Sequence, residues 1–87
     1  MVGQLAASRA GHDREEHYLV IREEGGYAYL ANGRSKTWAA PKKKNKKHIC
    51  LIPAGLSEDE VKELAANPAD ADTKIKRWIK NYERNSQ

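Results

Sequence analysis

The sequence predicts a small, mainly β domain that ends in two helices. Residues 1–53 contain short apolar clusters separated by turn residues, a pattern typical of a small barrel or a strongly bent sheet. Residues 54–87 instead carry helix start and stop signals and a helical apolar period. The 87-residue chain is long enough for one modest core. We therefore expect a five-stranded barrel followed by a helical tail that packs on it.

Five short strands are predicted before the tail. The clearest is the apolar run that begins at Tyr18, whose unbroken hydrophobicity indicates a buried strand. Asn32-Gly33 is the strongest hairpin signal, because both turn residues must accept positive φ. Pro41 should end the strand that follows, and the lysines after it should form a loop. The predicted strands span residues 3–8, 17–22, 27–31, 34–39 and 48–52.

The tail should form one helix at about residues 58–66 and a second at about 71–84. Ser57 can cap the first helix, and Glu60, three residues later, completes a capping box. Pro68 should stop this helix. Four apolar residues of the second helix share one face: Ile75, Trp78, Ile79 and Tyr82. We expect this face to pack on the barrel or on the first helix; the alternative is a protein-interaction module that binds a partner through it.

Positive charge is concentrated in one segment. The chain has a net charge of +4, yet residues 34–48 hold seven of its 16 Lys and Arg residues and no Asp or Glu. Such a patch attracts polyanions, because neutralising phosphates releases condensed counterions. The alternative is a solvated loop that keeps the protein soluble. The segment's candidate contacts are Arg34, Lys36, Lys42, Lys43, Lys44, Lys46, Lys47 and His48.

Trp38 lies within this basic segment and has two possible roles. Strand alternation would place it beside Arg34 and Lys36, where it could stack an unpaired base. A small barrel without Phe also needs large side chains inside, which favours the core. Four basic residues of the second helix could extend this polyanion-binding surface or simply suit the helix dipole: Lys76, Arg77, Lys80 and Arg84.

The sequence gives no sign of catalysis. It lacks a phosphate-binding glycine loop, a nucleophile elbow and a dinucleotide fingerprint, so we expect a non-enzymatic protein without catalytic residues or cofactors. His48 and Cys50 lack the spacing of a zinc site, and Cys50 is expected to be a small buried residue. No apolar run approaches the ~20 residues that cross a bilayer, and the lone cysteine fits a reducing cytoplasm.

The order of several short motifs resembles the KOW domain, an SH3-like barrel of ribosomal proteins and transcription elongation factors. The matching segments are Gly3-Gln4-Leu5, Ser8-Arg9-Ala10-Gly11-His12-Asp13-Arg14, Tyr18-Leu19-Val20-Ile21, Asn32-Gly33-Arg34, Pro41-Lys42-Lys43-Lys44 and Lys47-His48-Ile49. The whole layout is similar to bacterial KOW-domain RNA-binding proteins related to an archaeal and eukaryotic large-subunit ribosomal protein family. Glu15-Glu16 stands where the KOW pattern usually has a second glycine.

This resemblance covers residues 3 to about 52 and implies a cytoplasmic RNA-binding protein of the translation apparatus. Its implied partners are ribosomal or other structured RNA, together with ribosomal or other translation proteins. By resemblance, Arg9, His12 and Arg14 would contact RNA. By charge, residues 34–48 would supply the larger part of the surface, with lysines acting on phosphates and little sequence specificity.

Overall fold

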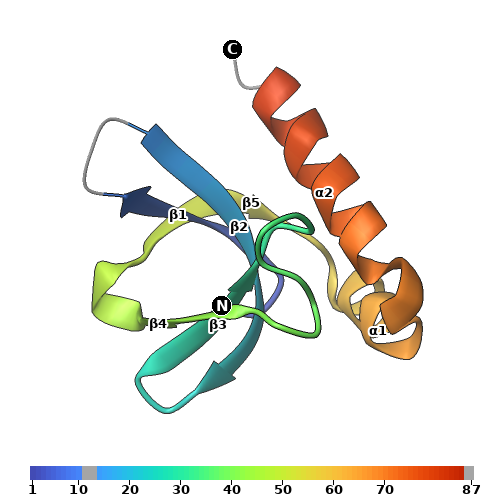
Figure 1. Cartoon of the computed structure of the whole chain (residues 1–87), viewed down its shortest axis with the longest axis horizontal. Helices are drawn as coiled ribbons and strands as arrows, with labels where there is room; N and C mark the ends of the chain where they lie inside the picture. Colours follow the sequence, from blue (N-terminus) through green and yellow to red (C-terminus); the bar gives the residue numbers. More distant parts are fainter. Residues whose placement is uncertain (11–13, 86–87) are drawn as a thin grey trace.

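A computed structural model describes residues 1–10 and 14–85 of the chain (Figure 1). It confirms the predicted class, a mainly β domain with a helical tail. The elements are β1 (Gln4–Ala10), β2 (Arg14–Glu24), β3 (Tyr27–Ala31), β4 (Lys42–Asn45), the 3-10 turn η1 (Lys46–His48), β5 (Cys50–Gly55), α1 (Glu58–Ala66) and α2 (Pro68–Asn85).

The five strands form one antiparallel sheet in the order β4-β3-β2-β1-β5. The central strand β2 is long and its pairing with β3 shifts between Val20 and Arg22, an irregularity that increases strand bending. The sheet curls, and η1 connects its two edge strands, β4 and β5, which do not pair with each other (Figure 1). The barrel is therefore open along this seam.

The prediction for residues 34–39 was wrong, because no returning strand follows Asn32-Gly33. The side-chain oxygen of Asn32 accepts hydrogen bonds from the backbone N–H groups of Arg34 (2.9 Å) and Lys36 (3.0 Å). These bonds hold a wider turn in a long connection, residues 32–41, which we call the 32–41 loop. The strand instead forms later, at Lys42–Asn45, where a lysine loop was expected.

Both predicted helices are present. At α1, Ser57 Oγ accepts a bond from the Glu60 N–H (3.2 Å), and the Glu60 carboxylate accepts one from the Ser57 N–H (3.0 Å), which confirms the capping box. The bond from the Ser57 backbone holds the pKa of Glu60 below its ordinary value. α2 begins at Pro68, earlier than predicted, because proline has the φ of a first helical residue and the N–H that it lacks would have no helical partner there.

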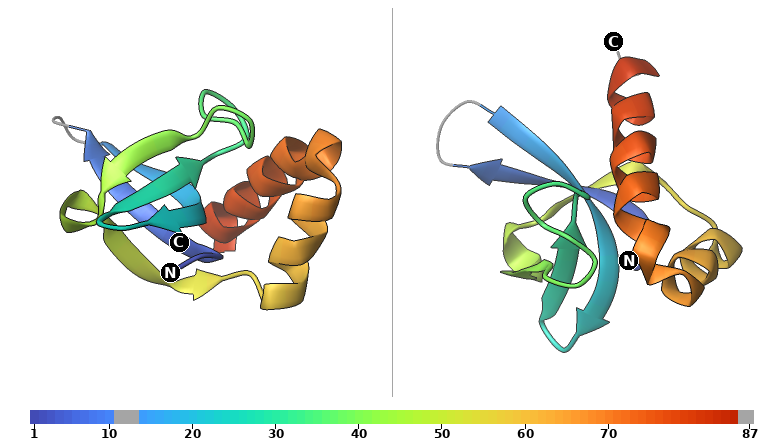
Figure 2. Two further views of the ribbon diagram at one scale, coloured as in Figure 1. Left: turned by 90° about the horizontal axis from the view of Figure 1, so that it is seen from below. Right: turned by 45° about the vertical axis from the view of Figure 1, so that its right-hand side comes forward.

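The sheet buries residues on both faces because strand side chains alternate. The inner, concave face holds one core cluster: Ala6, Tyr18, Val20, Ala28 and Leu30. On the outer face the strands and helices share a second cluster: Leu5, Leu19, Ala31, Leu64, Ala71, Ile75 and Ile79. Both helices therefore lie outside the bent sheet, as Figure 2 shows.

The 32–41 loop is fastened to α2. The backbone N–H of Trp38 donates to the Asp72 carboxylate at 2.7 Å. Gly33 has a φ of +78°, and a Cβ at this position would lie 2.3 Å from the backbone oxygen of Asp72. Only glycine combines that left-handed conformation with so close an approach to the helix.

Replacing Ile75 by alanine tests how much this packing contributes. Ile75 is fully buried between α2 and the sheet, so Ile75→Ala should lower the free energy of unfolding by about 2–5 kcal/mol. Urea unfolding followed by circular dichroism measures the change. The exposed neighbour Lys74 is the control, since Lys74→Ala should alter stability by no more than about 0.5 kcal/mol. Equal midpoints for the two variants would contradict the packing described here.

Candidate nucleic-acid interface

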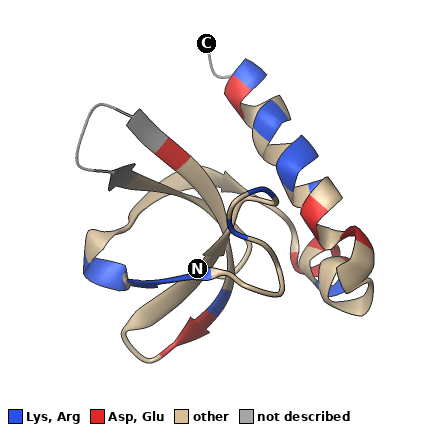
Figure 3. Cartoon of the chain, viewed as in Figure 1, with Lys and Arg blue, Asp and Glu red and all other residues tan. Residues whose placement is uncertain are grey.

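The fold separates the basic segment, residues 34–48, into two regions. Arg34 and Lys36 belong to the 32–41 loop, which lies against α2. The other basic residues lie on β4 and η1, at an edge of the sheet. Figure 3 shows positive residues along α2 and the loop, and a separate group on β4 and η1. The segment thus contributes to two surfaces instead of one.

The lysines of β4 alternate between the two faces of the sheet. Lys42 and Lys44 are half-buried on the inner face: Lys42 Nζ lies 5.8 Å from the centroid of the Tyr18 ring, and Lys44 Nζ donates to Ser8 Oγ. Lys43 points outward and places its Nζ 4.5 Å from the centroid of the Tyr27 ring. Lys43 is therefore the β4 lysine best placed to reach a ligand on the outer surface.

Tyr18 is the large residue beneath these inward lysines. Burial raises its pKa to about 12, and its hydroxyl also donates to the Glu16 carboxylate. The phenol therefore remains protonated at neutral pH, and its ring offers Lys42 a neutral aromatic face. Lys42 and Lys44 are therefore engaged in contacts within the protein, on the inner face of the sheet.

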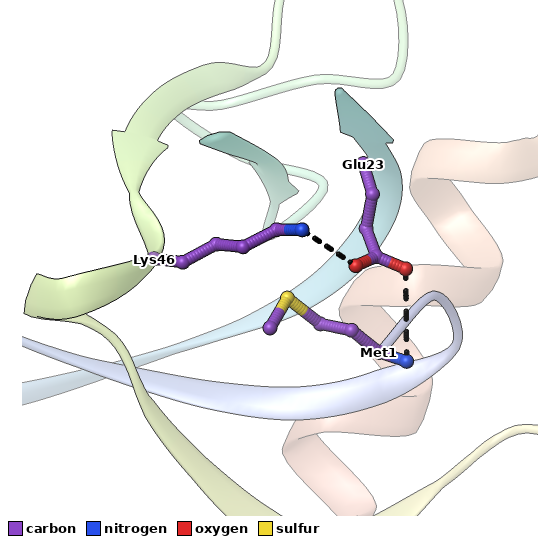
Figure 4. A network of polar contacts seen from close by, with 3 residues as sticks. All are labelled: Met1, Glu23 and Lys46. Atoms are coloured by element: carbon purple, nitrogen blue, oxygen red, sulfur yellow. Dashed lines mark ion pairs between the residues drawn. The ribbon is translucent and has the colours of Figure 1, made fainter. Parts of the chain in front are cut away.

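Lys46 on η1 is held in an ion pair (Figure 4). Its Nζ lies 2.9 Å from one carboxylate oxygen of Glu23, and the amino group of Met1 lies 3.7 Å from the other. The hydrogen bond from Lys46 is the main cause that holds the pKa of Glu23 below its ordinary value of 4.5. Lys47 and His48 are exposed, and neither makes an ion pair with the described residues.

The second basic region is a groove between the 32–41 loop and α2, which we call the loop–helix groove. It has a volume of about 420 Å³. Its lining contains no acid and five cationic side chains: Arg34, Lys76, Arg77, Lys80 and Arg84. The uncharged residues Thr73 and Asn81 complete the lining. Lys76, Lys80 and Arg84 recur every four residues and so lie along one side of the helix.

A neighbouring hollow shows where the positive region ends. It shares Arg34, Lys76 and Lys80 with the loop–helix groove but also contains Glu16 and Glu83. The Glu83 carboxylate is engaged by His17 Nδ1 at 2.6 Å. The acid-free surface is therefore the side of α2 that carries Arg77 and Arg84 as well as the shared lysines.

The helix cations are the residues whose role the sequence reading left open. Basic residues on a helix are equally compatible with a role in balancing the helix dipole. Arg34 lies about forty residues earlier, and no neighbouring residue in the sequence indicates that it lies beside them in the fold. The close approach of Gly33 to α2 brings these cations together. An i, i+4 series of bases on an exposed helix face was the one available signal.

Two of the three residues implied by the KOW resemblance lie on the described parts of β1 and β2. Arg9 on β1 pairs through its backbone with Glu15, and Arg14 on β2 pairs with Ala10. Their side chains and all of His12 lie outside the described residues. Their contact with RNA therefore stays a prediction.

Trp38 takes a position between its two predicted roles. Its side chain is half-buried and packs against the edge of the outer core cluster. It also lines an open hollow together with Tyr29 and Arg22.

The expectation for Cys50 was wrong, because this thiol is exposed on the edge strand β5.

Other kinds of site are not evident in the part of the chain that the structure describes. It contains no group of three His, Cys, Asp or Glu side chains that could hold a metal ion. None of its helices combines the length and apolar character needed to cross a bilayer. Comparison with known proteins finds no matching family model and no significantly similar curated relative.

The Glu23–Lys46 pair predicts a pH effect. Because the folded-state pKa of Glu23 is lowered, the pair stabilises the fold above the ordinary value of 4.5 and is lost as the pH falls through the lowered value. An NMR titration of the Glu23 carboxyl should give a pKa that rises toward 4.5 in Lys46→Gln. Lys47→Gln is the control and should leave the titration unchanged; an equal rise in both variants would contradict the pairing.

Proposed function

We propose that the protein binds RNA through the loop–helix groove, with Lys43 and Lys47 as additional contacts. The observation that carries the proposal is the gathering of five cations around one acid-free groove. Like charges that lie close together repel one another and destabilise the unbound protein. A bound polyanion relieves this repulsion, so the groove is a favourable site for one. A phosphate backbone meets this requirement because each neutralised phosphate releases condensed counterions.

The geometry favours recognition of the backbone over recognition of sequence. Lys76 and Arg84, with Lys80 between them, are eight positions apart on α2, or about 12 Å along the helix axis. Lysine acts on phosphate as a mobile point charge, whereas Arg34, Arg77 and Arg84 can donate paired hydrogen bonds to phosphate oxygens. Such contacts fix position and orientation and carry little sequence information.

RNA is favoured over DNA by the KOW resemblance. The motif order from Gly3 to Ile49 is similar to a ribosomal protein-related family, and the open five-stranded sheet is compatible with its SH3-like barrel. The proposed ligand is therefore ribosomal or other structured RNA in the translation apparatus, where ribosomal or other translation proteins would be neighbours. Shape and phosphate contacts dominate recognition of double-stranded RNA.

The alternative, a protein-interaction module that uses the apolar face of α2, has less support. Ile75 and Ile79 of that face are buried against the sheet, and Trp78 and Tyr82 are partly buried in the same cluster. What α2 offers to solvent is mainly its basic side. That surface suits a polyanion better than an apolar partner.

A pair of matched double variants tests the groove. Lys76→Gln/Lys80→Gln removes two charges from the groove and should weaken binding to transfer RNA about ten-fold or more at physiological salt. It should also lower the slope of log K against log salt by about 1.4–1.8, the share of two phosphate contacts. Fluorescence anisotropy over a salt series measures both quantities.

The control is Lys62→Gln/Lys74→Gln, which removes two charges from α1 and α2 away from the groove. It should keep the affinity close to that of the unchanged protein. If the two double variants lost equal affinity, the effect would be explained by net charge alone, and the groove would be overturned as the binding site. Competition by duplex DNA as strong as that by RNA would overturn the choice of RNA.

The two neighbouring lysines of η1 give a second, finer test. Lys47 is exposed and without an ion pair among the described residues, whereas Lys46 is paired with Glu23. Lys47→Gln should therefore weaken RNA binding more than Lys46→Gln, while Lys46→Gln should lower the melting temperature more. Anisotropy and thermal unfolding, run on both variants, decide the order; the reverse order in affinity would remove Lys47 from the contact surface.

A further inference from the structure

We propose that Tyr29 and Trp38 form a stacking site for an unpaired base of RNA. The site is the open hollow of about 250 Å³ on the outer side of β3, which we call the aromatic hollow. It is lined by Ile21, Arg22, Tyr29, Trp38, Ala39 and Pro41. The inference rests on the proposed function and adds a single-stranded RNA segment as the ligand of a second site.

The fold presents these two aromatic side chains from separate segments. Ala28 and Leu30 are fully buried on the inner face, so alternation directs Tyr29 between them to the outer face, where it is half-buried. Trp38 reaches the same hollow from the 32–41 loop, whose position is fixed by the hydrogen bond to Asp72. Trp38 is thus packed against the outer core cluster at one edge, and both side chains line the hollow.

Arg22 makes the hollow suitable for a base. Its guanidinium carbon lies 4.0 Å from the centroid of the Tyr29 ring. Its side chain is 62% exposed, and its ion pair with Glu24 is loose at 3.8 Å, so the guanidinium is free to lift from the ring. A base entering there would lie between an aromatic ring and a guanidinium plane, the two surfaces on which proteins stack unpaired bases.

The surrounding charge selects a nucleic acid over an apolar peptide. Lys43 is the register partner of Tyr29 on β4 and lies on the same outer face, within reach of a phosphate next to a stacked base. Arg22 supplies a second cation. Stacking needs an exposed base face, which a duplex does not offer, so the ligand must be single-stranded at this point.

The 32–41 loop joins this site to the loop–helix groove. Arg34 lines the groove and Trp38 lines the aromatic hollow, only four residues further along the chain. A single RNA could therefore place a stem on α2 and an adjoining unpaired nucleotide against Tyr29. The two sites should then contribute separately to affinity.

Tryptophan fluorescence in a Trp78→Phe background tests the stacking directly, because Trp38 is then the only tryptophan. A short oligoadenylate should quench its emission in a saturable manner. An abasic ribose-phosphate oligomer of equal length should bind more weakly and leave the emission unchanged. Quenching of the same size by the abasic oligomer would overturn the site, since phosphates alone would then account for it.

Matched variants of Tyr29 separate stacking from folding. Tyr29→Ala should weaken oligoadenylate binding about five- to 150-fold, the range expected when one stacked base is lost. Tyr29→Phe keeps the ring and should keep the affinity, and both variants should bind blunt duplex RNA like the parent protein. Thermal unfolding checks that Tyr29→Ala is folded at the binding temperature.

The outcomes distinguish this site from the proposed function. If transfer RNA binds but Tyr29→Ala and Tyr29→Phe bind oligoadenylate equally well, the aromatic hollow is not a base site and RNA binding through the groove stands. If neither transfer RNA nor oligoadenylate binds the parent protein, the proposed function fails and this inference fails with it.

Discussion

The hydrogen bond from the Trp38 N–H to the Asp72 carboxylate, with the close contact of Gly33 on α2, determines what the surface of this protein can do. It fixes an otherwise irregular loop on a helix that is itself buried against the sheet through Ile75 and Ile79. As a result, Arg34 lines the same groove as the cations of α2, and Trp38 lines the same hollow as Tyr29. Both proposed sites depend on one loop being held in one place.

The curled sheet also determines which charges are available. Alternation along β4 turns Lys42 and Lys44 toward the inner face, where the Tyr18 ring and Ser8 receive them, and leaves Lys43 outside. The charge of Lys46 is neutralised by its ion pair with Glu23. A run that looks uniform along the chain is therefore divided by the fold into structural and accessible cations, and counting lysines overstates the binding surface.

The features that the sequence predicts well are those set by neighbouring residues. The capping box at Ser57 and the strand at residues 27–31 depend on local chemistry, and both are found where expected. Strand β4 was missed because its pairing with β3 defines it, while its lysines have little β preference of their own. The loop–helix groove was missed for a similar reason, since Arg34 and Lys80 meet only through tertiary structure.

The open seam between β4 and β5 has a consequence for self-association. An unpaired edge strand can serve as a template on which another chain adds a strand. Along β4, a second copy would have to bring its own backbone up to Lys42 and Lys44, whose inward ammonium groups would lose hydration in the extended sheet. Inward-pointing charge on an edge strand is one of the ways in which β proteins disfavour such pairing, and Lys42 and Lys44 meet that description.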